Sequence, residues 1–250
     1  MKKPIATIMA AAGILAAFAD TSTNTGATGT PTPEKQYPWE SSISAGLTVT
    51  SGNSDTILGT LAAGSTRKTP ENEFSFGIDA AYGKANSVNN LETYHAFGQW
   101  NHLFTDRFFS YVRAEFLRDT IADLNYRISL SPGVGYYLIK GTNTTLAVEA
   151  GPGVVFRDLG GNSETYATLR LAERFEHKFS PGARIWQSLE ILPQIDRWQN
   201  FTVNAELGAE AAFTKSLSLQ VVLSDSYNSE PAFGRKRNDL KLVSGVAYKF

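Results

Sequence analysis

Apolar and polar residues alternate strictly along most of this chain. Between residues 200 and 213 one row of alternate positions is apolar and the other is polar or small, and the apolar row is Val203, Ala205, Leu207, Ala209, Ala211 and Phe213. Because successive side chains of a strand point to opposite faces, this period of two predicts a β-strand with one apolar face. Similar rows occur at 73–83, 145–157 and 216–224.

The alternation predicts twelve strands joined by turns. The expected ranges are 39–50, 55–68, 72–84, 91–103, 107–119, 124–139, 144–158, 164–178, 184–195, 200–213, 216–227 and 238–250. Tight connections such as 105–106 and 214–215 alternate with more polar, usually longer ones such as 84–90 and 228–238. This alternation is typical of an up-and-down antiparallel meander with both chain ends on the side of the short turns.

Such a meander could be a soluble barrel with an apolar interior or a membrane barrel with an apolar exterior. Three features favour the membrane: the strands are longer than soluble strands usually are, their number is even, and aromatic residues gather at their ends. Those near the short turns are Trp39, Phe104, Phe108, Phe179, Trp186, Phe213, Tyr248 and Phe250, and those near the longer loops are Tyr82, Tyr126, Phe156, Trp198, Phe201 and Tyr227. We therefore predict an all-β fold, a transmembrane antiparallel up-and-down β-barrel of about 12 strands.

The last strand fits this prediction. Leu240, Leu242, Val246, Tyr248 and Phe250 share one face, so the strand presents an apolar row that ends in an aromatic belt. Pairing with the first strand would close the barrel and fix the end of the chain. A final strand that ends in Phe also resembles the signal that the outer-membrane assembly machinery recognises in its clients.

The first residues read as an export signal. Lys2 and Lys3 precede an apolar stretch, and Ala17-Phe18-Ala19 matches a small-x-small cleavage pattern. We expect residues 1–19 to be a signal peptide, 20–37 a flexible periplasmic leader, and 38–250 the barrel. The chain has no cysteine, and its formal net charge of −1 argues against a nucleic-acid partner.

Several stretches resemble the YdiY-like or salt-induced outer-membrane protein family of Gram-negative bacteria. They are WESSISAGLTVTSGNSDT at 39–56, DRFFSYVRAEFLRDTIADLNYRISLSPGVGYYL at 106–138, EAGPGVVFRD at 149–158, ERFEHKFS at 173–180 and YNSEPAFGRKRNDLKLVSGVAYKF at 227–250. The resemblance implies a barrel in the outer membrane, with membrane lipid and lipopolysaccharide as surroundings. It brings no catalytic residues.

The row that would face the lumen carries both signs of charge. Its charged members are Asp79, Arg113, Glu115, Arg127, Glu149, Arg170, Arg174, Glu190, Glu206, Glu210, Asp225 and Lys241. Regular hairpins would place Glu115 opposite Arg127 and Glu149 opposite Arg174. These charges could form an ion-pair lattice that braces a narrow barrel or a ring that selects solutes, and mixed charge favours bracing.

Two prolines fall in the middle of neighbouring strands. A hairpin centred on residues 141–142 puts Pro132 opposite Gly151, with Pro152 beside it. Each proline removes a donor from the strand ladder, so we expect a bulge or kink that either shapes the barrel or leaves a weak seam or a wider pocket.

Sequence motifs for catalysis or cofactors do not emerge. The histidines are His95, His102 and His177, and none has a serine at a spacing that would identify a nucleophile. We expect no enzyme activity, cofactor or metal site, with a lipid-modifying enzyme as an alternative function. The basic residues Arg235, Lys236 and Arg237 are candidates for contact with lipopolysaccharide phosphates.

Taken with the resemblance, the pattern predicts an outer-membrane barrel that is either a narrow passive channel for small solutes or a structural envelope protein in osmotic or salt adaptation. The sequence is compatible with a monomer.

Overall fold

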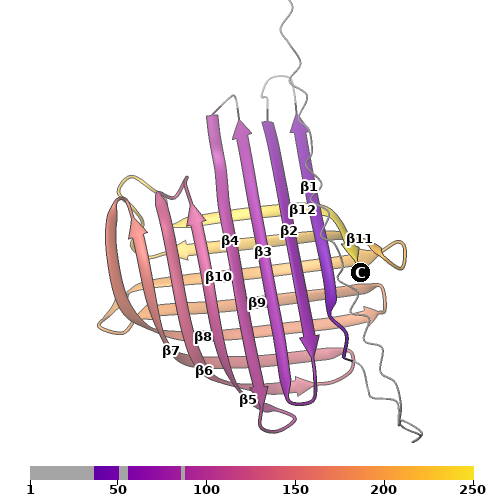
Figure 1. Ribbon diagram of the computed structural model, residues 1–250. Coiled ribbons are helices and arrows are strands. Elements are labelled where there is room, and N and C mark those ends of the chain that lie inside the picture. The colour runs from indigo at the N-terminus through magenta and orange to yellow at the C-terminus, as the bar shows by residue number, and fades with distance from the viewer. Residues whose placement is uncertain (1–36, 51–55, 86–87) are drawn as a thin grey trace, which may run out of the picture. The chain divides into compact units, whose positions relative to one another are not determined.

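The computed structural model is a closed barrel of twelve antiparallel strands (Figure 1). It describes residues 37–50, 56–85 and 88–250, so the expected signal peptide and almost all of the expected leader lie outside the described residues. The strands are β1 (Glu40–Thr50), β2 (Thr56–Lys68), β3 (Asn72–Ala85), β4 (Val88–Leu103), β5 (Phe108–Asp119), β6 (Leu124–Lys140), β7 (Thr144–Leu159), β8 (Asn162–Ser180), β9 (Ala183–Gln194), β10 (Arg197–Ala212), β11 (Leu217–Asn228) and β12 (Asn238–Lys249). Each strand pairs with its neighbours in sequence, and β1 pairs with β12. No helix long and apolar enough to span a bilayer occurs in the described part of the chain.

The predicted strands are confirmed, with every boundary within three residues of its expected place. The predicted difference in loop length is mostly wrong, because several strands extend into the expected loops. The connections at 160–161 and 195–196 have only two residues, and the one long connection in the described chain is 229–237. We call the end of the barrel that carries Tyr37 and Phe250 the terminal end, and the other the far end.

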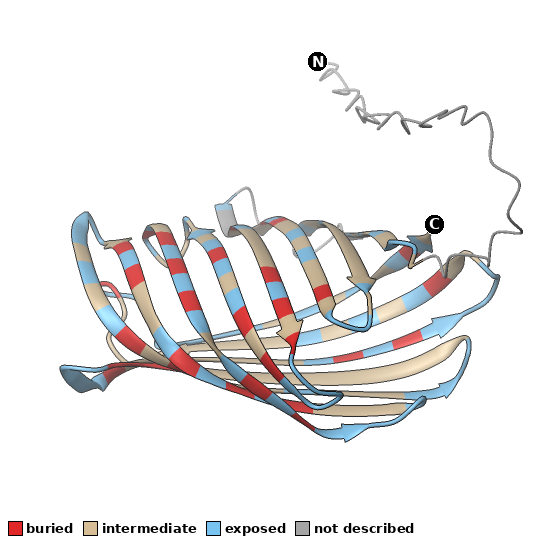
Figure 2. Ribbon diagram, turned by 60° about the horizontal axis from the view of Figure 1, so that its bottom comes forward, coloured by how far each residue is buried: buried red, intermediate tan, exposed pale blue. Residues whose placement is uncertain are grey.

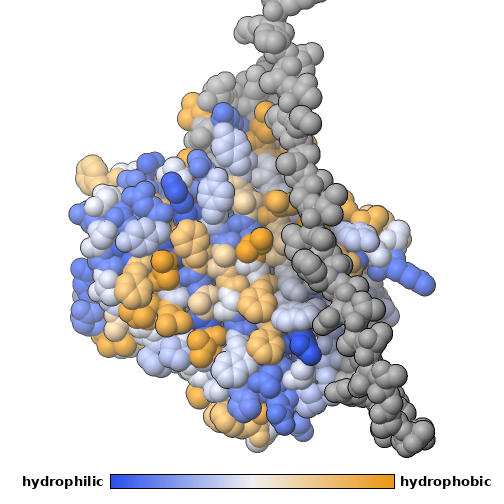
Figure 3. Space-filling view, in the orientation of Figure 1, coloured by the Kyte–Doolittle hydropathy of each residue, from blue (hydrophilic) through white to orange (hydrophobic). Residues whose placement is uncertain are grey.

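The two faces of the wall differ as a membrane barrel requires. Outward side chains include Leu47, Ile78, Leu207 and Leu242, each more than half exposed, and Figure 3 shows apolar side chains gathered across the middle of one face. Inward positions alternate with them and are mostly buried or half-buried, which gives the banded strands of Figure 2. An apolar exterior around a polar interior is the inverse of a soluble barrel, and a closed barrel is the only β-structure that satisfies its backbone in lipid.

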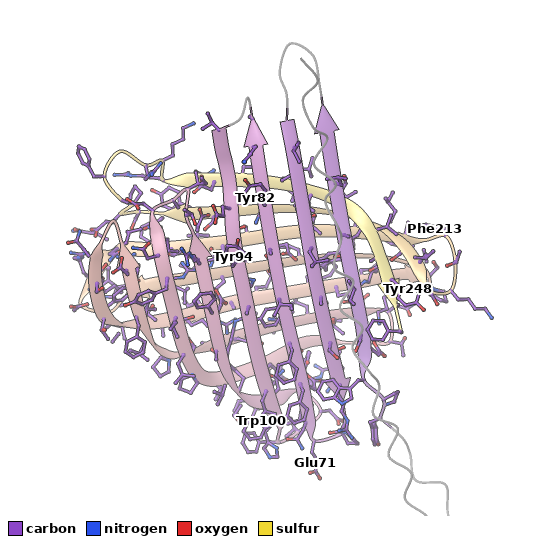
Figure 4. All side chains as sticks on the ribbon, turned by 45° about the horizontal axis from the view of Figure 1, so that its top comes forward. Glu71, Tyr82, Tyr94, Trp100, Phe213 and Tyr248 are labelled. Carbon is purple, nitrogen blue, oxygen red and sulfur yellow. The ribbon has the colours of Figure 1, made fainter. Side chains whose placement is uncertain are left out.

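The outward aromatic residues lie near the two ends, as expected. Seven of the eight expected at the terminal end are more than a third exposed: Trp39, Phe104, Phe108, Phe179, Phe213, Tyr248 and Phe250 (Figure 4 labels Phe213 and Tyr248). The prediction for Trp186 is wrong. Its Nε1 donates to Glu206 Oε1 at 2.6 Å, so this ring points into the lumen.

The two mid-strand prolines face each other, whereas the sequence placed Pro132 opposite Gly151. The register of β6 and β7 runs through Leu130–Val154 and resumes at Val134–Ala150, which aligns Pro132 with Pro152. Neither proline has an N–H, so the ladder is interrupted between these pairs. Each missing donor would have pointed at the other proline, and the ladders to β5 and β8 continue past Pro132 and Pro152 without a shift.

Candidate functional site

A layer of charged and amide side chains fills the lumen between β3 and β9. At its centre, the Arg170 guanidinium donates to Glu149 Oε2 at 2.7 Å and to Glu190 Oε2 at 2.5 Å. These residues stand at inward positions of three adjacent strands, β7, β8 and β9. The fork of donors on arginine suits this double pairing, since the planar group presents several N–H donors in fixed directions.

Other members of the layer join strands that are not neighbours in the wall. Gln99 on β4 donates to Glu149 on β7 at 2.8 Å, and the Tyr137 hydroxyl on β6 donates to Glu73 on β3 at 2.5 Å. Arg113 Nε lies 4.0 Å from Glu190 Oε2 on β9. These contacts join strands that lie three or four places apart in the wall, so the layer ties together parts of the wall that share no ladder.

A second group of the layer surrounds Glu115 on β5. Arg113 Nη2 lies 2.7 Å from Glu115 Oε2, and Arg127 Nη2 lies 3.6 Å from Oε1 of the same carboxylate. His95 stands between two carboxylates, with Nδ1 2.7 Å from Asp79 Oδ1 and Nε2 3.7 Å from Glu115 Oε1. This arrangement links β3, β4, β5 and β6 through one charged cluster.

The centre of the layer is buried. Gln99 and Arg170 are 3% exposed, and Glu149 is 7% exposed. Toward the terminal end the buried rings of Phe109 and Tyr111 close the space beneath them. A Cβ at Gly135 would collide with the Phe109 ring, so the ring packs directly on the backbone of β6. A carboxylate or guanidinium buried in this way must be paired, and the layer supplies those partners.

The inner face of β8 to β12 near the terminal end is less enclosed. Arg184 lies 2.8 Å from Glu210 and 3.1 Å from Glu176, and Lys249 forms an ion pair with Glu210. The side chains of Arg184 and Lys249 remain 32% and 42% exposed. Water therefore reaches this side of the lumen. Among the described residues, no group of three or more His, Cys, Asp or Glu side chains is placed to hold a metal ion.

The structure places eleven of the twelve predicted lumen charges on the inner face. Asp225 is the exception: it is paired with Ala205 and Leu240 in the outward row of β11, where Leu223 also lies, so its assignment to the lumen is wrong. The predicted pairings are wrong as well. Glu115 stands opposite Ser129 and Glu149 opposite Ala172, although Arg127 still reaches Glu115 diagonally.

Sequence reasoning missed the uncharged and terminal members of the layer. Glu73, Gln99, Asn101 and Tyr137 all point inward, and Asn101 Nδ2 donates to Glu73 Oε2 at 3.2 Å. Their signal was available, because each lies in the polar row of an alternating strand. Of the predicted residues, Arg174 and Lys241 lie on the inner face with no ion pair in the described structure.

The far mouth is covered by the connection at 229–237. Ala232 is buried beside Gly160, and Arg197 Nη2 lies 2.5 Å from Glu230 Oε2, so the connection is fixed to the rim at two places. Lys236 lines a cavity of about 70 Å³ together with Asp119 and Asp239. Arg235 and Arg237 are exposed on this connection, next to the fully exposed Phe233.

Comparison with known proteins identifies the family. The family model described as "Protein of unknown function, DUF481" matches residues 43–250. The chain belongs to the DUF481 family. It is also 26% identical over 195 residues to the uncharacterized protein YdiY of Escherichia coli (strain K12), covering 78% of this chain and 76% of YdiY. The predicted resemblance to YdiY-like proteins is thereby confirmed.

Solved structures resemble this DUF481 protein in fold. The NanC porin matches with a TM-score of 0.54 at 8% identity, over 84% of this chain and all of the porin. The translocator domain of autotransporter NalP from Neisseria meningitidis matches with a TM-score of 0.47 at 17% identity, over 88% and 90% of the two chains. At these identities the likeness to NanC concerns the fold alone, a twelve-stranded barrel of the outer-membrane type.

Proposed function

We propose that this protein is an outer-membrane barrel of a Gram-negative bacterium, in which the charged layer braces the wall and keeps the lumen closed at rest. The observation that carries the proposal is the burial of Gln99, Glu149 and Arg170 across the lumen. In an open pore, inward side chains would be bathed in water. The apolar outer face, the aromatic residues at both ends and the signal-like first residues support the location.

A role in the mechanical or osmotic adaptation of the envelope fits such a barrel. Hydrogen bonds between Gln99 and Glu149 and between Tyr137 and Glu73 oppose a change in the curvature of the wall, because each joins two strands that are three places apart. A narrow passive channel for small solutes is the second candidate. It is favoured by the partly exposed Arg184 and Lys249 on the inner face, which mark a side of the lumen that water reaches.

Single-channel recording on the refolded protein tests the proposal. We expect the wild type to show no stable open-pore conductance, and the double variant Glu149→Ala/Arg170→Ala to conduct, because it removes the centre of the layer. Arg184→Ala is the matched control, an inward arginine outside the layer, and should leave the trace unchanged. A wild-type conductance typical of a water-filled pore and insensitive to the double variant would overturn the proposal and favour the channel.

We propose lipopolysaccharide phosphate as the partner of the exposed basic residues at the far mouth, Arg235, Lys236 and Arg237. The connection that carries them is held by the Arg197–Glu230 pair, so the cations are presented on a fixed segment. Replacing all three with Gln should reduce co-purified lipopolysaccharide several-fold. Replacing the exposed terminal-end lysines Lys68, Lys140 and Lys215 makes the same charge change and should have no effect, and equal losses in both triple variants would contradict a specific contact.

A further inference from the structure

The seam that closes the barrel is much shorter than any other strand pairing. Register pairs between β1 and β12 are limited to Ser42–Ala45 with Val246–Lys249, although β1 continues to Thr50 and β12 begins at Asn238. On its other side β1 pairs with β2 over its whole length, and β12 pairs likewise with β11. Both strands are therefore well formed, and only their mutual contact ends early. In Figure 4 they meet near Tyr248 and diverge toward the far end.

Two glycines lie where the pairing stops. A Cβ at Gly245 would lie 2.5 Å from the Ala45 carbonyl oxygen, and one at Gly46 would collide with the Ser244 carbonyl oxygen. The two backbones thus touch at this point with no side chain between them. Beyond it, in the part of the chain that the structure describes, the facing edges of β1 and β12 have no strand partner, so their N–H and C=O groups lie outside any ladder. Unpaired edges are tolerated at membrane depth only where they line a polar or water-filled space.

The outward side chains on the two edges of the seam are apolar. Leu47 is 74% exposed, and Leu240 and Leu242 are 67% and 63% exposed, which places them among the most exposed leucines of the wall. In a fully paired seam, Leu47 and Leu242 would cover part of each other, since both point outward from adjoining strands. Their exposure agrees with a gap between the strands.

The inner side of the seam carries small side chains and a lysine that forms no ion pair among the described residues. The inward residues that flank it are small, namely Ser42, Ser44, Gly46, Thr60, Ala62, Gly64, Gly245 and Ala247. Lys241 stands on the unpaired part of β12, opposite Ser224 of β11. No ion pair of Lys241 occurs with any residue the structure describes. An ammonium group that faces the lumen beside outward leucines fits a molecule with an anionic headgroup and an alkyl chain.

We propose that the β1–β12 seam is a lateral opening, through which an amphiphile with an anionic headgroup passes between the lumen and the membrane. The headgroup would lie inside, beside Lys241, and its oxygens would accept hydrogen bonds from the free N–H groups of the two edges. The alkyl chain would leave between Leu47 and Leu242. This proposal is independent of conduction along the barrel axis, because the opening leads through the wall and not from one end of the lumen to the other.

Disulfide trapping tests whether the seam is open, and the cysteine-free chain needs no background substitutions. Ala45→Cys/Val246→Cys joins a pair that is in register. Val49→Cys/Leu242→Cys joins positions that the same register would bring face to face in a fully closed seam. Since a disulfide requires Cα atoms within about 7 Å, we expect the second pair to cross-link in vesicles at least about ten-fold more slowly than the first. Equal rates would overturn the proposal.

Quenching by brominated lipid tests the ligand class. A fluorophore at Val243→Cys faces the lumen beside the seam, and one at Ser188→Cys faces the lumen on β9 as the control. In vesicles with brominated acyl chains, the first should be quenched and the second should not. Quenching should be stronger with phosphatidylglycerol than with phosphatidylcholine, and Lys241→Gln should abolish that difference. Absence of quenching at Val243→Cys, or quenching with no preference for the anionic lipid, would overturn the assignment. Heat-dependent gel migration confirms that each variant is folded.

Discussion

The wall from β3 to β9 and the seam between β1 and β12 are built from the same alternating pattern but are held by different interactions. In the wall, neighbouring strands share long ladders, and a buried charged layer joins strands across the lumen. At the seam, four register pairs and the mutual hydrogen bonds of Ser41 and Phe250 join the strands. The difference indicates that this barrel concentrates its ladders and cross-strand contacts in one part of its circumference and has few of them at the seam.

The largest effect should come from breaking the centre of the layer. Arg170→Leu leaves Glu149 and Glu190 without their shared partner in a buried site, so we expect a loss of about 3–5 kcal/mol in the free energy of unfolding. Urea titration in vesicles measures it. Arg174→Leu should cost far less, because this inward arginine on the same strand is exposed and forms no ion pair with any described residue. Similar losses in both variants would show that the layer has no special role.

A smaller effect should come from crowding the wall where an aromatic ring lies on glycine. Gly135→Val would clash with the Phe109 ring, and we expect a cost of about 1–3 kcal/mol because the packed interior has no room to adjust. Gly59→Val on β2 is the matched control, since nothing lies within 4 Å of a Cβ there. The same titration compares them. A large loss for Gly59→Val would indicate that β2 is packed as tightly as the wall.

The smallest effect should be a gain, at the interruption between β6 and β7. Pro152→Val returns an N–H that can donate toward Pro132, and we expect stabilisation of about 1 kcal/mol. Leu169→Val, at the neighbouring outward position on β8, makes a change of similar size without adding a donor and should not stabilise. If Pro152→Val destabilises the barrel, the interruption shapes the wall in a way that the restored hydrogen bond cannot replace.

The fold could be predicted from sequence because the strand period is local. Rows such as Val203 to Phe213 show which face is apolar. The number of turns between such rows gives the number of strands. The register could not be predicted, since it shifts at irregularities such as those between Leu117 and Asp119 and between Tyr137 and Ile139. Glu115 faces Ser129 and not Arg127, and Glu149 faces Ala172 and not Arg174, because each of these two ladders is centred one residue away from the place that the turn predicted.

The site could be predicted only as a set of inward charges. Its decisive contacts, such as Gln99 with Glu149, depend on the curvature of the whole sheet. The strand pairing that can be read from neighbouring hairpins does not predict this curvature. Asp225 was misplaced because charge alone suggested the lumen, whereas its position beside Leu223 in the alternation assigns it to the outer row. The short seam was also hidden, because β1 and β12 each alternate as well as any other strand.

The hydrogen bond between Tyr137 and Glu73 bears on the order in which the barrel assembles. Its two strands, β3 and β6, are separated by two others, so the bond can form only after the sheet between them has curled. A sheet that is curled and locked in this way already holds its two edges nearer together. Part of the conformational entropy cost of joining β1 to β12 is then already met before the two strands touch. The barrel can therefore close with only a few hydrogen bonds between them.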